Sequence, residues 1–392
     1  MKLLINTESL LPPITGIGTY TQNLLEQFLA MQALETIECF SGHHFTSATQ
    51  ALQQCGASIE RAAPLVSSRG HLVQFLRNSS LAYRARETLR NSLLRLKSAR
   101  LRNFVYHEPN FILRTHKGPC VATIHDLSFI HYPHYHPPKR VAWLTRELPR
   151  TLARADMLIT DSEQVRQELI ARYAVDEQRV RAIYLGAADC YTELPASQTS
   201  ATLAEYGLEH DRYLLFVGTL EPRKGVDTLI EAWSRLPEPM RQEYPLVLAG
   251  AQGWNNHDLQ ARIDSLAMTH GLRHLQFVPI EALPSLYAGA SIFVYPSLYE
   301  GFGLPVLEAM NCGTPVICTT ETTMAEFSAG ATMLCEPGNS EQLKDLMQKL
   351  LEDDARRATL GKAGLERAKV FSWQRCASET LAVYRVVSGA SA

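Results

Sequence analysis

The stretch Ser291-Ile-Phe-Val-Tyr-Pro-Ser-Leu-Tyr-Glu-Gly-Phe-Gly-Leu-Pro-Val-Leu-Glu308 contains the unit that decides the fold. Its first five residues, 291–295, are mostly apolar or aromatic and predict a buried strand. Pro305 predicts the first turn of a helix, because proline lacks an N–H that would be unbonded there anyway. Gly301 and Gly303 predict a loop between this strand and this helix. A strand, a loop and a helix in this order are the unit of a parallel α/β sheet.

The rest of the chain repeats this alternation of apolar runs and helical patterns. The other runs that predict strands are 2–6, 103–107, 119–124, 156–160, 213–218, 246–250 and 314–318. Such alternation predicts an α/β fold with parallel sheets covered by helices on both faces. Between 186 and 211 a polar stretch is the best candidate for an interdomain linker. We therefore predict two doubly wound domains, 1–189 and 190–372, whose strand-end loops face each other across a cleft.

The composition is that of a two-domain globular enzyme. At 392 residues the chain can bury two cores, and its 46% apolar and 20% charged residues are ordinary values. No uninterrupted apolar run approaches the roughly 18 residues of a membrane-spanning helix, and no signal-peptide pattern follows Met1. The eight cysteines form no Cys-x-x-Cys pair, which favours reduced thiols in a cytoplasmic protein.

The sequence gives little support for a metal site. The pattern His131-x-x-His134-x-His136 has no cysteine or carboxylate beside it, which favours solvated loop histidines. The chain also contains no Asp-x-Asp motif. We therefore expect no metal and no other cofactor.

Two carboxylates flank the predicted helix start in the opening stretch. Glu300 lies on the loop and Glu308 lies inside the helix. Carboxylates accept hydrogen bonds from sugar hydroxyls, and the N–H groups at a helix start suit a diphosphate. Gly301 and Gly303 let a ligand approach the backbone. Taken singly, each glutamate could be a solvated residue or one favoured by the helix dipole. Together they predict a cradle for a sugar phosphate.

Two adjacent cations follow another predicted strand, in Phe216-Val-Gly-Thr-Leu-Glu-Pro-Arg-Lys-Gly225. Arg223 and Lys224 lie at a turn, where they could neutralise a diphosphate leaving group as its charge develops. A hydrogen bond to a charged group contributes about 1.5–3 kcal/mol, whereas a helix terminus contributes roughly 0.3–1 kcal/mol. The pair should matter more than the helix dipole, although cations in a turn are commonly solvated.

The front half holds two weaker candidates. Gly16 and Gly18 follow the first predicted strand and open a helix, and His125-Asp126 ends the strand 119–124 at the cleft side. A nicotinamide-binding fingerprint would need glycine at position 21, which is Thr21. That difference disfavours an oxidoreductase.

The Glu-x7-Glu spacing, together with the Arg223-Lys224-Gly225 turn, strongly resembles the signature of family 4 retaining glycosyltransferases with the GT-B fold. The resemblance implies two facing Rossmann-like domains, the first on the acceptor side and the second binding a nucleotide sugar, and a helix over 373–392 that packs back on the first. It implies catalytic roles for His125, Arg223, Lys224 and Glu300. The donor-binding residues that it implies are Gly16, Gly18, Gly218, Arg223, Lys224, Gly301, Phe302, Gly303, Leu304 and Glu308.

Individual roles follow from the same resemblance. Glu300 and His125 are expected to contact the transferred sugar, and Glu308 the ribose. Asp126 is a weaker candidate that would orient the imidazole or position the acceptor hydroxyl. The sequence departs from the family at Thr219, where an arginine often follows the strand glycine. This departure affects the expected donor contacts.

The motifs Gly16-Ile-Gly-Thr-Tyr20 and Val217-Gly-Thr-Leu-Glu-Pro-Arg-Lys224 are also similar to those of bacterial mannosyltransferases of O-antigen assembly. This similarity implies retaining transfer of a hexose, mannose from GDP-mannose, to a lipid-linked glycan in cell-surface polysaccharide synthesis. Three alternatives stay open. They are transfer from a UDP- or dTDP-sugar to another acceptor, a GT-B-like epimerase, and a non-catalytic sugar-nucleotide binder.

A basic segment in the front half suggests where an acceptor would lie. Residues 69–102 carry nine Lys and Arg and one acid, interleaved with apolar residues. Such a pattern predicts a basic amphipathic helix on an anionic membrane, or a solvated face or nucleic-acid patch. Because the family binds acceptors on this half, we expect a lipid-linked acceptor, no nucleic acid, and a peripheral location at the inner face of the plasma membrane.

Overall fold

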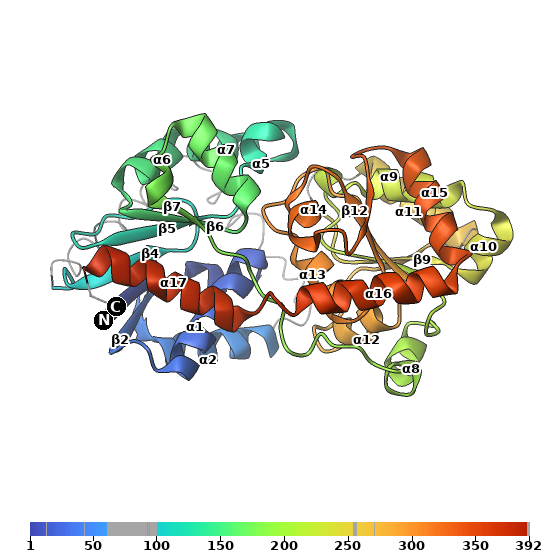
Figure 1. The fold of residues 1–392 in the computed structure, drawn as a ribbon, viewed down its shortest axis with the longest axis horizontal. Coiled ribbons are helices and arrows are strands. Elements are labelled where there is room, and N and C mark those ends of the chain that lie inside the picture. Colours follow the sequence, from blue (N-terminus) through green and yellow to red (C-terminus); the bar gives the residue numbers. More distant parts are fainter. Residues whose placement is uncertain are drawn as a thin grey trace, which may run out of the picture.

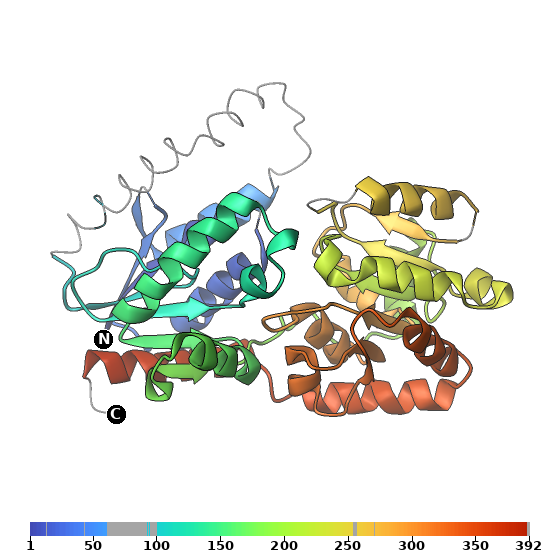
Figure 2. The same ribbon diagram turned by 90° about the horizontal axis from the view of Figure 1, so that it is seen from above.

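The computed structural model describes residues 1–389 except Pro13, His43, 61–91, 93, 95–99, 254–256 and 270. Two α/β domains lie side by side, each built around its own sheet (Figure 1). A view from above shows the same two bodies, with the last helix lying along the first domain (Figure 2). The predicted fold class and the two doubly wound domains are confirmed.

The first domain contains a seven-stranded sheet in the order β3-β2-β1-β4-β5-β6-β7, in which only β2 and β3 pair antiparallel. Its strands are β1 (Lys2–Asn6), β2 (Thr36–Phe40), β3 (Phe45–Ser47), β4 (Phe104–Glu108), β5 (Cys120–Ile124), β6 (Met157–Thr160) and β7 (Val180–Ala182). Its helices are η1 (Glu8–Leu10), α1 (Gly16–Met31), α2 (Ala48–Glu60), α5 (Ser128–His131), η2 (Pro133–Tyr135), α6 (Pro138–Arg154), α7 (Glu163–Tyr173) and η3 (Glu177–Arg179). Every residue of β4 and β5 is buried, as expected for central strands covered on both faces.

The second domain contains a six-stranded parallel sheet in the order β10-β9-β8-β11-β12-β13. Its strands are β8 (Leu214–Val217), β9 (Leu246–Ala249), β10 (Arg273–Leu275), β11 (Ile292–Tyr295), β12 (Val316–Thr319) and β13 (Met333–Cys335). Its helices are α8 (Ala196–Glu205), η4 (Pro222–Lys224), α9 (Val226–Ser234), α10 (Glu238–Glu243), α11 (His257–Thr269), α12 (Leu283–Ala288), α13 (Leu304–Asn311), α14 (Thr323–Ser328), α15 (Ser340–Leu351) and α16 (Asp354–Ala368).

Both sheets reverse their winding direction at an internal strand. In the second sheet β8 lies between β9 and β11, so the chain winds outward in one direction and then in the other. Loops at the carboxyl ends of strands on either side of such a point line the ligand crevice of open α/β sheets. Arg223 and Lys224 follow β8, and Glu300 follows β11. The topology therefore brings together charges that are 76 residues apart in the chain.

The predicted strands all form, with ends that differ by a residue or two. For example, the run 103–107 is β4, Phe104–Glu108, and the run 314–318 is β12, Val316–Thr319. In the described part of the chain the sequence reading missed β2, β3, β7, β10 and β13. Four of these have three residues each, too few to show a periodic apolar pattern.

The predicted linker over 186–211 is wrong in part, because it contains helix α8, which packs against α12. This helix buries only Thr199 and Leu203, so its sequence carries almost no apolar signal. The stretch that joins the two sheets without a helix or strand is 183–195. The predicted domain boundary between 189 and 190 falls within it and stays a prediction.

The chain returns to the first domain in its last helix. Between α16 and α17 (Trp373–Ser388) it crosses back, and α17 packs against α1, β4, β5 and β6 (Figure 1). The two crossing segments pair with each other through Ala187 and Ser372. The Cβ of an alanine at Gly186 would lie 2.1 Å from the Trp373 nitrogen, so only glycine allows this close approach.

A buried hydrogen bond attaches α17 to the first sheet. The Tyr384 hydroxyl lies 2.6 Å from His107 Nδ1, and His107 Nε2 lies 2.8 Å from the Thr123 hydroxyl. All three side chains are fully buried. Burial lowers the pKa of His107 to about 3, so its ring is neutral.

Tyr384→Phe should lower the free energy of unfolding by about 1–3 kcal/mol, because it leaves a buried imidazole nitrogen without a partner. Urea denaturation measures the change. Val386→Ala on the same helix, at a side chain that is 67% exposed, is the matched control and should change stability little. Equal stability of Tyr384→Phe and wild type would show that this bond does not hold α17 in place.

Candidate active site

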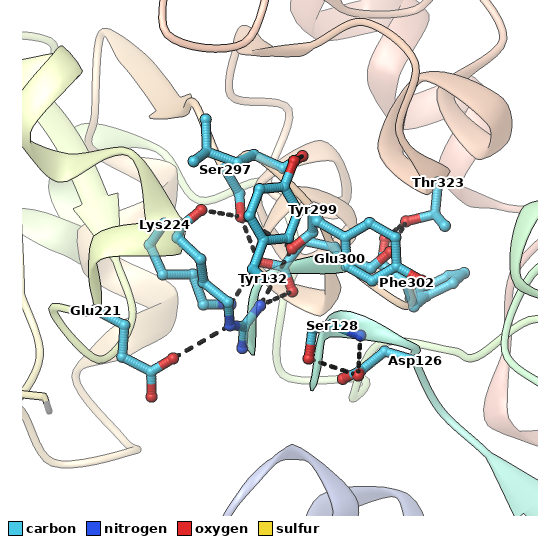
Figure 3. A network of polar contacts seen from close by, with 12 residues as sticks. Asp126, Ser128, Tyr132, Glu221, Lys224, Ser297, Tyr299, Glu300, Phe302 and Thr323 are labelled. Carbon is cyan, nitrogen blue, oxygen red and sulfur yellow. Dashed lines mark hydrogen bonds and ion pairs between the residues drawn. The ribbon is translucent and has the colours of Figure 1, made fainter. Parts of the chain in front are cut away.

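Glu300 is held by two cations at the carboxyl ends of β8 and β11 (Figure 3). Its Oε1 lies 2.5 Å from Lys224 Nζ and accepts a 2.7 Å hydrogen bond from the Ser297 hydroxyl. Its Oε2 lies 3.4 Å from Arg223 Nη1. Lys224 also donates a 2.7 Å bond to the Tyr295 hydroxyl at the end of β11. The three charges predicted for the site therefore form one cluster.

Electrostatics fixes the charge of this cluster. Burial alone would raise the pKa of Glu300, but Lys224 and Arg223 outweigh it and lower the pKa to about 2. For Lys224, burial and the neighbouring Arg223 lower the pKa despite Glu300. Burial would lower the pKa of Arg223 too, but Glu300 and Asp126 raise it well above its usual value. Glu300 is thus a carboxylate at neutral pH, beside an arginine that stays charged.

Backbone bonds hold the cationic turn against the glutamate loop. The Arg223 carbonyl accepts from the Leu298 N–H at 2.8 Å and from the Ser297 hydroxyl at 3.1 Å. Gly225 has φ +70°, and its added Cβ would lie 2.1 Å from the Pro296 carbonyl oxygen. A side chain there would push the turn away from the loop. The geometry of the ion cluster therefore depends on this glycine.

Glu308 lies one helical turn inside α13, as predicted, and accepts a 2.7 Å bond from the Tyr287 hydroxyl of α12. Burial raises the pKa of Glu308 to about 7. This carboxyl therefore differs from Glu300, because burial sets the direction of its pKa shift, whereas Lys224 and Arg223 lower the pKa of Glu300. Hydroxyl donors of a bound ligand would favour its ionised form.

His125 lies at the end of β5 with both ring nitrogens occupied. Its Nδ1 lies 2.7 Å from Asp161 Oδ2, and its Nε2 lies 2.7 Å from the Pro109 carbonyl oxygen. Asp126 Oδ1 instead accepts from the backbone and hydroxyl of Ser128 (Figure 3). The first of the two roles predicted for Asp126, orienting the imidazole, is therefore wrong, because Asp161 makes that contact. Its alternative role, positioning the acceptor hydroxyl, stays a prediction. The expected sugar contact of His125 stays a prediction.

The two domains contact each other at the glutamate loop. The Tyr299 hydroxyl accepts from the Leu127 N–H at 3.1 Å and donates to Glu168 of α7 at 2.7 Å. The added Cβ of an alanine at Gly301 would lie 1.9 Å from the His125 carbonyl oxygen. Tyr299 and Gly301 flank Glu300, so these contacts place the glutamate beside the strand ends of the first domain.

Steric contacts within the protein explain why two of the predicted donor-binding positions, 301 and 303, are glycine. Gly301 is required by the approach of the first domain. Gly303, the N-cap of α13, has φ +102°, and its added Cβ would lie 2.6 Å from the Met324 side chain. Neither constraint involves a ligand, and the predicted approach of a ligand to these glycines stays a prediction. Their backbone atoms still line the loop.

The remaining predicted donor-binding residues are Phe302, Leu304 and Gly218. Phe302 is buried and stacks on Phe327 at 4.7 Å between ring centroids, and its carbonyl oxygen accepts a 2.8 Å bond from the Thr323 hydroxyl. Leu304 is the first residue of α13 and packs on the core. Gly218 ends β8 with φ +151°. Their donor contacts stay predictions.

The glycines near the N-terminus open α1 as predicted, but only one is constrained. Gly16 is the first residue of the helix, and its added Cβ would meet nothing within 4 Å. Gly18 is buried, and its added Cβ would lie 2.6 Å from the Ser9 carbonyl oxygen of η1. Packing against η1 therefore explains Gly18. A role in binding a donor stays a prediction for both.

Sequence reasoning missed several residues that build the site. Glu326 of α14 accepts from the Glu163 and Gln164 N–H groups of α7 at 2.9 and 2.7 Å, and from the Tyr184 hydroxyl at 2.5 Å. It thus satisfies a helix N-terminus of the other domain. No local motif marks such a contact. Asp161 was not missed in this way, because it directly follows strand β6 and its sequence position is as typical of a site residue as of a helix N-cap.

Several observations bear on the other predicted features. All eight cysteines are free, and only Cys190 is exposed. Among the described residues no group of three or more His, Cys, Asp or Glu could hold a metal ion. His131 bonds Glu168 at 3.0 Å, and His134 packs on Tyr135.

None of the helices in the described ranges has both the length and the apolar character needed to cross a bilayer. The segment 69–102 lies almost wholly outside the described residues.

Gly301→Ala should separate the glutamate loop from the first domain, with an overpacking cost of about 1–3 kcal/mol. Small-angle X-ray scattering should show a larger radius of gyration than for wild type. The control Gly56→Ala, whose Cβ meets nothing within 4 Å, should leave it unchanged. An unchanged radius in Gly301→Ala would show that this contact does not limit domain approach.

Comparison with known proteins agrees with this geometry. Residues 201–367 match the family model of glycosyl transferases group 1, and 14–188 match that of glycosyltransferase family 4. The chain is 33% identical over 387 residues to the O-antigen chain mannosyltransferase B of Escherichia coli, covering 99% of this chain and all of that one. It is 32% identical over 231 residues to the serotype-specific mannosyltransferase WbdA of Escherichia coli, covering 57% of this chain and 28% of that protein.

Solved structures share the fold. Anabaena HepE in complex with UDP and glucose superposes with a TM-score of 0.70 at 18% identity, covering 98% of this chain and 99% of that one. Sucrose-phosphate synthase from Thermosynechococcus elongatus gives 0.71 at 22%, covering 100% and 99%. WaaG, a glycosyltransferase involved in lipopolysaccharide biosynthesis, gives 0.69 at 16%, covering 99% and 100%. With its full-length relative, its two family matches and its two-domain architecture, the chain belongs to the family 4 glycosyltransferases of the GT-B fold.

Proposed function

We propose that this enzyme transfers mannose from GDP-mannose, with retention of configuration, to a lipid-linked glycan in O-antigen synthesis. The observation that carries the proposal is the cluster of Glu300, Lys224 and Arg223, a carboxylate and two cations at adjacent strand ends. The full-length similarity to an O-antigen mannosyltransferase supports the choice of sugar and acceptor class. The nucleotide is inferred from the sequence resemblance.

The charge distribution matches the parts of a nucleotide sugar. Arg223 and Lys224 would bind the diphosphate, whose negative charge competes with Glu300 for the lysine. Glu300, a carboxylate with its pKa near 2, would accept from hydroxyls of the transferred sugar. Glu308 would accept from the ribose, and its pKa near 7 falls as those hydroxyls donate. Donor binding should therefore strengthen as pH rises through 7.

The proposed reaction exchanges one glycosidic bond for another on the same face of the sugar. The bond between the anomeric carbon and the diphosphate oxygen breaks, and its electron pair stays on that oxygen. The bond to the acceptor hydroxyl oxygen forms, and the hydroxyl proton passes to the departing phosphate oxygen. Arg223 and Lys224 stabilise the charge that develops on the phosphate. Because these cations supply that stabilisation, the proposal needs no bound metal.

The acceptor would approach from the first domain and a membrane surface. The described helix that supports this is α6, whose residues Lys139, Arg140, Arg146, Arg150 and Arg154 are exposed. The segment 69–102 adds nine further cations by sequence. Basic surfaces attract anionic lipid by about 1 kcal/mol per residue near the membrane. We therefore place the enzyme at the inner face of the plasma membrane as a peripheral protein.

A transfer panel tests the donor assignment. GDP-mannose should support transfer, and UDP-glucose, UDP-galactose and dTDP-rhamnose should not, while NMR of the product should show the donor's anomeric configuration. Glu300→Gln keeps the size of the side chain and should lower kcat/KM by about 10²–10³-fold. Glu341→Gln, at a side chain that is 63% exposed, is the matched control. An inverted product, or near-normal activity of Glu300→Gln, would contradict the proposal.

Vesicle sedimentation tests the membrane assignment. The protein should sediment with vesicles that contain anionic phospholipid and stay in the supernatant with neutral vesicles. Raised salt should release it, because salt screens the attraction. Arg140→Glu combined with Arg146→Glu should reduce sedimentation, whereas Lys344→Glu in the second domain should not. Equal recovery from anionic and neutral vesicles would refute the location.

A further inference from the structure

The ring of His125 is enclosed by two acceptors. Its side chain is 8% exposed, Asp161 Oδ2 lies 2.7 Å from Nδ1, and the Pro109 carbonyl oxygen lies 2.7 Å from Nε2. A carbonyl can only accept, so Nε2 must carry a proton. An ionised carboxylate can only accept too, so Nδ1 must then carry a second proton. With Asp161 ionised, these two contacts fit an imidazolium bound to a carboxylate.

The surroundings leave the ring little freedom to turn. Tyr20 of α1 packs edge-on at 5.1 Å between ring centroids, and Phe111 packs edge-on at 5.8 Å. The His125 ring cannot turn away from Asp161 unless Tyr20 or Phe111 also moves. His125 is therefore fixed in orientation by two hydrogen bonds and two aromatic contacts.

Among the titratable groups near the ring, Asp126 adds a weaker attraction to that of Asp161, and the others are neutral. From β4, His107 is neutral because burial lowers its pKa to about 3. From α1 and α17, Tyr20 and Cys376 stay protonated, because burial raises the pKa of each. On its own loop, Asp126 is bound to Ser128. Burial lowers the pKa of His125, but Asp161, the Pro109 carbonyl and Asp126 together outweigh burial, and the net direction is upward. Burial also raises the pKa of Asp161, and His125 opposes that shift.

Among the described residues, Asp161 makes no side-chain hydrogen bond through its second oxygen. Asp161 is 3% exposed, and its Oδ1 accepts no hydrogen bond from the described residues. Buried carboxylates are normally satisfied on both oxygens. This one makes a single strong bond, to the imidazole. A purely structural cap role belongs instead to the next residue, Ser162, which accepts from Val165 N–H at the start of α7.

The backbone of His125 is what the second domain contacts. Its carbonyl oxygen faces Gly301, where an added Cβ would lie 1.9 Å away, and Leu127 N–H donates to the Tyr299 hydroxyl. We propose that Asp161 is a positioning residue, which keeps His125 doubly protonated and thereby fixes the segment 125–127 on which the Glu300 loop rests. This inference rests on the proposed transfer function for its kinetic consequence, though not for the charge of the ring.

Asp161→Asn is the variant that separates charge from shape. An asparagine of the same size can donate its amide N–H to a neutral Nδ1, while Nε2–H still bonds Pro109. The ring would lose its positive charge, and its two charge-assisted hydrogen bonds would become weaker neutral ones, so that segment 125–127 would be held less tightly. Asp345→Asn, at a side chain that is 63% exposed on α15, is the matched control.

The test uses histidine labelled with ¹³C at Cε1 and a pH titration by NMR, with the His125 signal assigned by its loss in His125→Gln. The wild-type ring should be doubly protonated from pH 6 to 7, and the ring in Asp161→Asn should be neutral over that range. Transfer by Asp161→Asn should fall about a hundredfold in kcat/KM, as expected for a misplaced reacting loop. Asp345→Asn should match wild type in both readouts.

The outcomes separate the two proposals. A neutral His125 ring in wild type at pH 6, or an unchanged doubly protonated ring in Asp161→Asn, would overturn the role of Asp161. A ring that loses its proton in Asp161→Asn without any loss of transfer would also overturn it. Wild-type protein that transfers no sugar from any donor would refute the proposed function, while the ring titration would still report on Asp161.

Discussion

The ion cluster of Glu300 with Lys224 and Arg223 is the constraint on which the site depends. A carboxylate and two cations are mostly buried here, with exposures of 10–15%, and removing charges from water is costly unless each is paired. The turn after β8 and the loop after β11 must therefore stay together, and Ser297, Tyr295 and Gly225 serve that arrangement. A bound diphosphate would take over hydrogen bonds of the two cations, so the cluster already has the charges that a nucleotide sugar needs.

Parallel topology places this cluster, and interdomain contacts complete its surroundings. β8 and β11 are neighbours at the point where the winding of the second sheet reverses, which is where open α/β sheets bind ligands. The loop that carries Glu300 then rests on the first domain through Tyr299 and Gly301. Glu326 forms a second contact on α7, and the crossing segments pair at Ala187 and Ser372. Chemistry assigned to one domain thus depends on how closely the other approaches.

The sequence was sufficient for the fold class with its two domains and for the residues of the ion cluster, because strand-end motifs such as Glu300-Gly-Phe-Gly carry their charges locally. It was insufficient wherever a residue works through a partner from a distant strand. Asp161 meets His125 only because β5 and β6 pair, and Gly301 is glycine because of the other domain. Phe302 points into an aromatic cluster, and α8 has too few apolar residues to show a period. Short strands such as β7 also have too few residues to show an alternating apolar pattern in the sequence.

The most direct test of the account is a crystal structure of the enzyme with GDP-mannose carrying a non-transferable linkage. The account predicts the diphosphate within hydrogen-bond distance of Arg223 and Lys224, a mannose hydroxyl on Glu300 and the ribose on Glu308. Lys224 should turn part of its bonding from Glu300 to the phosphate. A donor bound elsewhere, with the bond between Lys224 and Glu300 undisturbed and Glu308 without a ribose contact, would contradict it.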